Sequence, residues 1–452
     1  MKQWLVHNRS SAPGRRVAGT LLSGLVGASV SGLLGALLVR AAGLFRQVVT
    51  ARGFGLDLQL DAFLLALLVP TLIGGVVGVA LNSALVPALA GDPVSHDSGR
   101  VFWDAVAAAT FIGFTVGLAQ LGTAEVLAGL LGGTERSGLS SAVHGSLLWL
   151  SFVPMLVIQY EVIASGLIAR QRFFAAAALP VFTPASIGIA VGLGVRTATG
   201  LAIAALIGGA VVVLVGIAFS RRLYGRIQPT VGFAKRTFRS IGREASLLLG
   251  AMVIATSTVL VDKLMASGLG TGSISALEYG SRIPEAAMGV ATIAIANAIA
   301  QRSGFLASSG GKKELRRLLR RTTLWTVVIG TALGIILIAL SPMIVDTLYL
   351  GGSFTVEDAR LVSMVQMAYL AQVPFYLIAI LASRVLASIR ASRLIALATM
   401  THLVMSVGGN LLLMPLWGVV GIALATSAAY LVTGTGLFVL TQRRLSHHVA
   451  AA

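Results

Sequence analysis

Three arginines interrupt strongly apolar stretches of this sequence, where ionised side chains are rare. Arg40 and Arg46 flank Gly43, where the first apolar stretch runs into the connection to the second. Arg282 lies beside Pro284 in the first third of the eighth apolar stretch. An arginine in a bilayer-spanning helix costs at least about 3 kcal/mol, so these three are expected to face a shared cleft rather than lipid. Because a guanidinium fork stays charged and binds phosphate through two hydrogen bonds, the arginines predict a site for a phosphate or diphosphate.

Nearby carboxylates offer another account of the same arginines. Asp61, Glu278 and Glu285 could neutralise them in structural ion pairs. Asp61 opens the second apolar stretch, where an Asp is expected to cap the helix, and it could also hold the arginines or gate the outer mouth of a cleft. Lys263 follows Asp262, which favours a local ion pair or an ammonium group that snorkels to the interface. The residue types leave the anion site and the structural ion pairs both open.

One more carboxylate, Glu161, lies in the middle of an apolar stretch. It could bind a coupling cation, or it could be a structural carboxylate held by hydrogen bonds. The chain has no cysteine, and its six histidines form no HExxH or HxxEH pair. A phosphate loop of the form GxxxxGK followed by Ser or Thr is also missing from the sequence. We therefore predict no metal site, no cofactor and no nucleotide-driven step.

The elements that must position these residues are membrane-spanning helices. The chain of 452 residues is 56% hydrophobic and only 11% charged, whereas soluble domains carry about 25% charged residues. Because a run of about 20 apolar residues crosses the hydrocarbon core as a helix, the sequence predicts an all-α integral membrane protein of about twelve transmembrane helices. We expect the helices near residues 17–40, 62–90, 101–131, 143–169, 175–195, 199–220, 245–266, 274–301, 322–346, 361–383, 394–414 and 416–440.

The net charge of +18 follows from where the basic residues collect. Most of the 34 Lys and Arg residues fall in segments on one predicted side of the membrane, above all residues 1–16, 221–244 and 302–321. Cytoplasmic loops are enriched in Lys and Arg, so we expect both termini in the cytoplasm. The same distribution argues against a nucleic-acid partner.

Two short motifs recur at nearly the same separation along the chain. Val153-Pro154 recurs as Val373-Pro374. Pro70, followed five residues later by Gly-Val, recurs as Pro284 with the same spacing. These matches predict two homologous six-helix lobes. Because each lobe has an even number of helices, both would have the same orientation in the membrane, as parallel repeats do. We expect an N-terminal lobe at residues 1–228, a basic cytoplasmic linker at 229–244 and a C-terminal lobe at 245–452.

Two helical lobes joined by short loops are typical of transporters that work by alternating access. Energy would come from an ion gradient, the membrane potential or the substrate's own gradient. We expect no enzymatic activity, because the longest external loop, around residues 346–360, has only three carboxylates. An ion-coupled small-molecule exporter, with an essential acid such as Glu161, is one alternative. A membrane glycosyltransferase or a scaffold derived from a transporter is another.

The spacing of the charged residues resembles that of a known family. Its N-terminal signature is Arg40-Ala-Ala-Gly-Leu-Phe-Arg46, then Ala51-Arg-Gly-Phe-Gly55, then Asp61-Ala-Phe63. Two later segments, Tyr279–Glu285 and Leu348–Thr355, carry further matches. Together they resemble the MurJ/MviN lipid II flippases of the multidrug/oligosaccharidyl-lipid/polysaccharide exporter superfamily, over about residues 20–440.

This resemblance implies a V-shaped pair of six-helix lobes around a cationic central cavity. It implies a cargo saccharide linked to undecaprenyl diphosphate, moved from the inner to the outer leaflet of the bacterial plasma membrane. By motif position, Arg40, Arg46 and Arg282 would contact the diphosphate. Asp61 would be the matching acid of the second helix, and Glu285 would orient Arg282. Proteins of cell-wall or polysaccharide synthesis would be possible partners.

The chain departs from the family pattern at several positions. Gln47 and Ser281 stand where the lipid II flippases carry Asp, and residues 73–79 lack the charges that follow the second-helix proline in the family. The flippases also have fourteen spans, of which the last two line a groove for the lipid tail. The sequence therefore leaves two cargoes open, lipid II or another lipid-linked saccharide such as an exopolysaccharide repeat unit or an O-unit precursor.

Overall fold

The computed structural model describes residues 13–90, 96–132, 137–225, 253, 256–308, 312–389 and 391–447. Within these ranges every regular element is a helix, and an isolated bridge joins Gly351 to Phe354. The predicted all-α class is therefore confirmed. The predicted basic linker at residues 229–244 lies outside the described residues.

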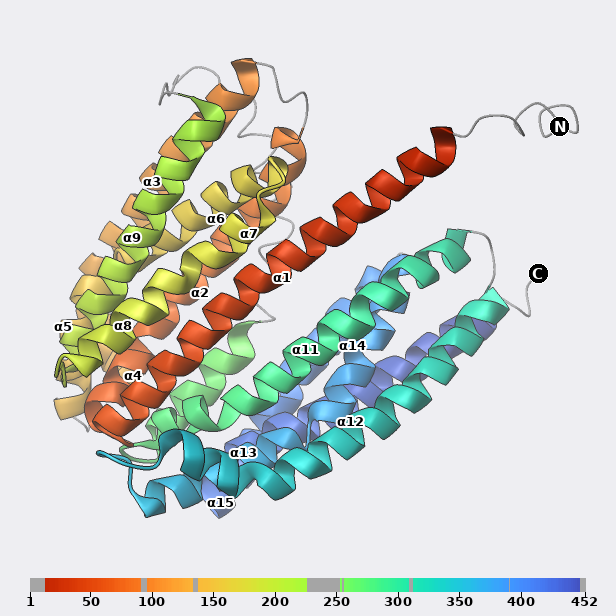
Figure 1. Ribbon diagram of the computed structural model, residues 1–452. Helices are drawn as coiled ribbons and strands as arrows, with labels where there is room; N and C mark the ends of the chain where they lie inside the picture. The colour runs from red at the N-terminus through yellow and green to blue at the C-terminus, as the bar shows by residue number, and fades with distance from the viewer. Residues whose placement is uncertain are drawn as a thin grey trace, which may run out of the picture.

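The helices form two bundles (Figure 1). The N-terminal bundle contains α1 (Pro13–Phe54), α2 (Leu58–Leu89), α3 (His96–Gly122), α4 (Ala124–Gly132), α5 (Ser137–Leu150), α6 (Val153–Ala169), α7 (Phe173–Ala178), η1 (Leu179–Val181), α8 (Phe182–Gly192) and α9 (Ala198–Tyr224). The C-terminal bundle contains the helical residues 256–267 and α11 (Ser273–Ser308), α12 (Lys312–Tyr349), α13 (Val356–Leu370), α14 (Val373–Ser388) and α15 (Ser392–His447).

The two bundles meet where α1 ends and α11 begins, and they separate toward the end of the molecule where α1 begins and α15 ends (Figure 1). α1 packs along α7 and α8 of its own bundle, while α11 packs on α13 and α14 of the other. The result is a V whose arms are joined at one end, the shape that the resemblance implies.

The first predicted helix was placed too short. α1 continues to Phe54 instead of ending near residue 40. After Pro13 it contains no proline, and a single glycine inside a helix costs only about 1 kcal/mol relative to alanine, so Gly43 does not end it. Arg40 and Arg46 consequently lie within a continuous helix, and not at a connection between two helices.

The repeated motifs occupy matching places in the two bundles. α6 and α14 both begin at the valine of the Val-Pro pair, with the proline in the first turn, where its missing N–H costs no helical hydrogen bond. Pro70 and Pro284 each lie inside a long helix, α2 and α11 respectively.

α15 turns back on itself. Its 56 residues would reach about 84 Å as one straight helix, far more than the roughly 30 Å of a hydrocarbon core. Gly418 has φ 56° and ψ −131°, which breaks the helix close to the boundary between the predicted helices at 394–414 and 416–440. A Cβ at Gly421 would overlap the carbonyl oxygen of Leu413, and one at Gly409 would lie 2.9 Å from the Cβ of Ala425. The halves on either side of Gly418 therefore run antiparallel.

Eight helices in the described part of the chain are long and apolar enough to cross a membrane, or nine if the pair α5–α6, bent by 42°, is one further passage. The predicted number of twelve stays a prediction. α11 is not among the eight, and it carries Glu278, Arg282 and Glu285. A long helix with these charges is suited to face a polar cavity.

The turn at Gly418 gives a first testable prediction. Gly418→Ala should lower the thermal stability of the purified protein, by about 1–2 kcal/mol, because a side chain is strained at this positive φ. Gly436→Ala is the matched control, since a Cβ there meets nothing within 4 Å and α15 has non-helical angles only at Gly418. Thermal unfolding in detergent compares the two variants, and equal stability would contradict a turn that depends on Gly418.

Candidate functional site

One buried carboxylate gathers cations from three helical segments. Glu278 of α11 accepts a hydrogen bond from Lys263 Nζ at 2.7 Å and another from Arg282 Nη2 one turn along the same helix. Arg46 Nη2, from α1 in the opposite bundle, lies 3.7 Å from Glu278 Oε1. Arg282 Nη1 also donates to Glu285 Oε2 at 3.0 Å. Three cations therefore share two carboxylates, and one positive charge is left over.

Two guanidinium groups of this cluster keep an unused donor. The Nε atoms of Arg46 and Arg282 are buried and have no hydrogen-bond partner among the described residues. A buried donor without an acceptor costs roughly 1–3 kcal/mol. The ion pairs that the sequence offered as an alternative are present, because Arg282 pairs with Glu278 and Glu285 and Arg46 lies near Glu278. An anion that reaches the two unused donors would remove their cost, so the cluster is also suited to receive an anion.

Arg40 lies apart from the cluster but faces the same helix. A Cβ at Gly289 of α11 would lie 2.7 Å from Arg40 Nη2, so the guanidinium rests against the backbone of the opposite bundle. Within the described residues, no carboxylate oxygen lies within 4.0 Å of this group. Arg40 and Arg46 thus both reach α11 from α1, as expected of arginines that face a shared cleft.

Asp61 ties the two bundles together. Its carboxylate accepts the backbone N–H groups of Gly272 and Ser275 at 2.6 and 2.8 Å, at the start of α11. The side chain is buried, and negative charge is favoured at a helix N-terminus. The expected cap of its own helix was wrong, because Asp57 caps α2 through Gln59 N–H at 2.7 Å. Among the described ion pairs Asp61 holds no arginine, which leaves the gate as the other role that the sequence offered for it.

A second set of backbone contacts closes the same end. Ser353 donates from its N–H to the carbonyl oxygen of Arg52 at 2.8 Å and from its hydroxyl to that of Gly53 at 3.0 Å. Gly55 and Gly352 have φ of +64° and +61°, and a Cβ on either would overlap backbone of the opposite bundle. These contacts and the Asp61 cap together form what we call the seam. The seam joins residues 52–61 of the N-terminal bundle to residues 272–275 and 352–353.

Glu161 lies away from the cluster. Its Oε2 accepts a hydrogen bond from Asn82 Nδ2 at 2.9 Å, and the same amide nitrogen lies 3.2 Å from the Glu161 carbonyl oxygen. A Cβ at Gly78 would lie 2.7 Å from Glu161 Cγ, so the side chain packs where α2 crosses α6. Of the sequence-predicted site residues, Arg46, Arg282 and Glu285 come together, Arg40 lies nearby on α1, and Asp61 and Glu161 lie elsewhere.

The cluster opens into a cavity of about 350 Å³ within the C-terminal bundle. Asp262 also lines this cavity, where it accepts hydrogen bonds from Asn410, Thr426 and Ser406 at 2.7, 3.1 and 3.3 Å. The expected local pair of Asp262 with Lys263 was wrong, because consecutive residues on a helix point about 100° apart. Glu278 was expected as a partner of the arginines, but its pairing with Lys263 was missed. The signal for that pairing was two opposite charges on neighbouring predicted helices of the same half.

Comparison with known proteins places this geometry in a family. The chain is 25% identical over 419 residues to the probable lipid II flippase MurJ of Thermotoga maritima, which covers 91% of this chain and 83% of that protein. Its fold is similar to a solved lipid II flippase MurJ in an inward closed conformation, with a TM-score of 0.76, 22% identity, and 92% and 90% of the two chains covered.

A multidrug resistance MATE family transporter of the MOP superfamily, solved in an inward-facing conformation, has a similar fold as well. Its TM-score is 0.74 at 15% identity, with 92% of this chain and 98% of that chain covered. The sequence model of the family described as "Lipid II flippase MurJ" matches residues 50–452, which include Asp61, Arg282 and Glu285 but neither Arg40 nor Arg46. The chain belongs to the lipid II flippase MurJ family.

Proposed function

We propose that this protein flips a saccharide linked to a polyprenyl diphosphate from the inner to the outer leaflet of the bacterial inner membrane, by alternating access. The observation that carries the proposal is the cluster on Glu278. Among the described residues it holds one more cation than anion, and two of its guanidinium groups have a buried Nε donor without a partner. A diphosphate supplies both the charge and the acceptor oxygens that this cluster lacks.

Substrate binding would displace Glu278 from Arg46. At 3.7 Å the contact of Arg46 with Glu278 is long, whereas Lys263 Nζ lies 2.7 Å from the same carboxylate and Arg282 Nη2 donates to it. A diphosphate could therefore take over Arg46 and the unused Nε of Arg282 while Glu278 stays paired with Lys263 and Arg282. Since Arg46 lies on α1 and Glu278 on α11, this exchange would replace a direct link between the bundles by one that runs through the substrate.

The seam would be the outer gate. The arms of the V separate at the end where α1 begins and α15 ends (Figure 1). The basic segments of the sequence support a cytoplasmic location for that end and for both termini, with the seam on the outer side. Release to the outer leaflet then requires the seam to part, which breaks the two hydrogen bonds of Asp61 and the two of Ser353.

The membrane potential could drive the step. Each elementary charge moved across the bilayer gains or loses about 2.3 kcal/mol per 100 mV, and a negative interior favours the exit of an anion. The two lobes, predicted at residues 1–228 and 245–452, would rotate relative to each other around the bound diphosphate. The function is transport without catalysis.

The departures from the family pattern bear on the cargo. Ser281 stands where the resemblance leads one to expect Asp, and its hydroxyl donates to the Glu278 carbonyl oxygen at 3.2 Å. Gln47, also in place of an acid, is buried on α1. The site therefore has fewer carboxylates to repel a diphosphate, so the polyprenyl-diphosphate class is retained. Lipid II and an exopolysaccharide or O-unit precursor both remain candidates for the saccharide.

An ion-coupled small-molecule exporter is the second candidate, favoured by the fold similarity to a MATE family transporter. Its coupling acid would have to reach the cavity. Glu161 is tied to Asn82 at the contact of α2 with α6, whereas Asp262 lines the cavity of the C-terminal bundle. An exporter would depend on one of these acids and tolerate the loss of Arg282.

The flippase proposal predicts that Arg282→Gln and Arg46→Gln each abolish the outer-leaflet appearance of lipid-linked saccharide. Loss of a charge-assisted hydrogen bond of about 1.5–3 kcal/mol corresponds to roughly a 10–100-fold weaker interaction. Leaflet-specific labelling of lipid-linked sugars in cells depleted of the native protein provides the measurement. Arg443→Gln, at an exposed position near the end of α15, is the control and should complement fully.

The same labelling assay distinguishes the flippase from the exporter. Full activity of Arg282→Gln together with loss of activity in Glu161→Gln or Asp262→Asn would establish the exporter and overturn the flippase. The reverse pattern, with Arg282 essential and Glu161→Gln active, is the expected result.

The proposed gate gives a further prediction. In a chain that has no native cysteine, Thr50→Cys introduces a single thiol at a buried position of α1 near the seam. Asp61→Asn should raise its labelling by a membrane-impermeant maleimide added outside, by about tenfold, because charge-assisted hydrogen bonds to α11 are lost. Asp57→Asn is the matched control, since Asn caps α2 as well as Asp does and the hydrogen bond from Gln59 N–H to Asp57 stays within its own bundle. Equal labelling in both variants would rule out Asp61 as a gate.

A further inference from the structure

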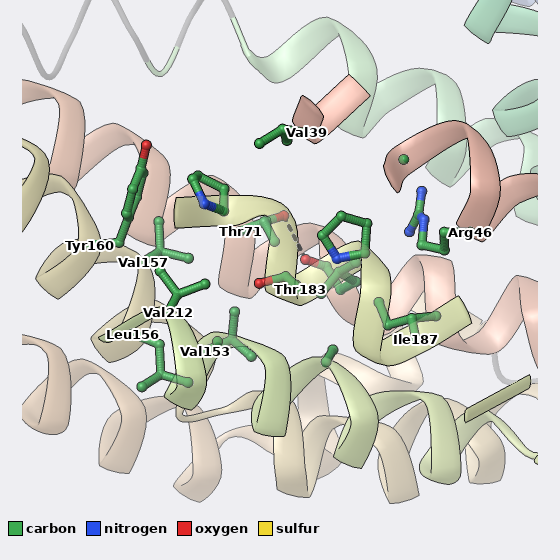
Figure 2. Close-up of a pocket in the computed structure, with 16 residues that line it drawn as sticks. Val39, Arg46, Thr71, Val153, Leu156, Val157, Tyr160, Thr183, Ile187 and Val212 are labelled. Atoms are coloured by element: carbon green, nitrogen blue, oxygen red, sulfur yellow. Dashed lines mark hydrogen bonds between the residues drawn. The ribbon is translucent and has the colours of Figure 1, made fainter. Parts of the chain in front are cut away.

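A second pocket, of about 320 Å³, lies inside the N-terminal bundle (Figure 2). It is formed by α1, α2, α6, α8 and α9 together with Pro180 of η1, and it shares no residue with the cavity of the C-terminal bundle. Arg46 lies at one end and Tyr160 at the other, with Val157 and Val212 beside Tyr160 (Figure 2). The volume is within the usual range for a small-molecule site.

The lining of this pocket is suited to an apolar occupant. Of the described residues that line it, Arg46 is the one that is ionised. The hydroxyl of Thr71 donates to the Leu67 carbonyl oxygen at 2.7 Å, and that of Tyr160 to the Ala176 carbonyl oxygen at 3.0 Å. Because these two donors are already used by the backbone, they offer little to water, and most of the other lining residues are apolar. An apolar group that fits this partly open pocket would gain dispersion contacts with the lining.

Arg46 connects the pocket to the anion cluster. The same side chain, with Ile187, lines the narrow space that holds Glu278 and Tyr279. An anion bound to Arg46 would therefore sit at the mouth of the apolar pocket. A ligand that fits both the cluster and the pocket has an anionic head attached directly to a hydrocarbon chain. The head would lie on Arg46 and the start of the chain in the pocket.

We propose that this pocket holds the isoprenoid units next to the diphosphate of the cargo lipid. The proposal rests on the proposed function, because it takes the diphosphate to lie on Arg46. It also supplies a place for the start of the lipid tail within the first of the two bundles. The pocket would make recognition depend on the isoprenoid as well as on the charge of the head group.

Gly43 allows the pocket to be filled from one side. It lines the pocket, and a Cβ there meets nothing within 4 Å, so a larger side chain can enter the space without displacing backbone. Gly43→Leu is the test variant. Gly436→Leu is the matched control. Gly436 is also a helical glycine at which a Cβ meets nothing within 4 Å, and Gly436 lines neither the pocket nor the cavity of the C-terminal bundle.

The experiment measures the binding of farnesyl diphosphate and of inorganic diphosphate to the purified full-length protein and both variants. Gly43→Leu should weaken farnesyl diphosphate about tenfold and leave inorganic diphosphate unchanged, because only the former has a chain to displace. Gly436→Leu should change neither. The affinity of each ligand is compared between the native protein and the variants, so the fraction of ligand that partitions into detergent is the same in each measurement. Unchanged farnesyl diphosphate binding in Gly43→Leu would overturn the proposal.

Inorganic diphosphate separates this inference from the proposed function. If the native protein does not bind it, the head-group site fails; if it binds but farnesyl diphosphate binds no more tightly, only the pocket proposal fails. Photo-labelling of the native protein with a diazirine-bearing farnesyl diphosphate decides the case in which Gly43→Leu disturbs Arg46 or does not fold. Label on α2, α6, α8 or α9 beside the pocket is the expected result, and label confined to the C-terminal bundle would contradict it.

Discussion

A charge inside a bilayer must be paired, hydrated or neutralised, and in this protein much of that requirement falls on Glu278. Lys263, Arg282 and Arg46 share this carboxylate. Arg46 reaches it from the opposite bundle. Removing it would leave cations facing each other in a medium of low dielectric constant. Yet three cations cannot be satisfied by this carboxylate and Glu285 alone. The remaining positive charge, and the guanidinium donors that have no partner among the described residues, are the reason we propose that the cluster receives an anion.

The closed end of the molecule depends on a different interaction, that of one buried carboxylate with the backbone of the other bundle. Asp61 and the positive-φ glycines Gly55 and Gly352 bring segments far apart in sequence into direct backbone contact. Such contacts are specific because they need the absence of a side chain, and they break as a unit when the bundles move. The molecule thus combines a long ion pair between the bundles, Arg46 with Glu278, with a set of hydrogen bonds at its closed end.

The sequence alone predicted the helical fold class and the meeting of Arg46 with Arg282 and Glu285, because buried charges must converge and an i,i+3 pair is local. It could not predict that α1 runs on to Phe54, since one glycine is a weak helix breaker. Nor could the sequence show that Asp61 caps α11, a helix whose first residues lie more than 200 positions further along the chain. Capping signals report the residue type that a helix end needs, but the identity of that helix is decided by tertiary packing.

The central claim is that the arginine cluster binds the diphosphate of a lipid-linked saccharide. Native mass spectrometry of the protein purified from its membrane, compared with Arg282→Gln prepared in the same way, tests it most directly. The account predicts a co-purifying polyprenyl-diphosphate-linked saccharide on the native protein, and its loss from the variant. Co-purifying lipids without a diphosphate, or the same lipid retained equally by Arg282→Gln, would contradict the account.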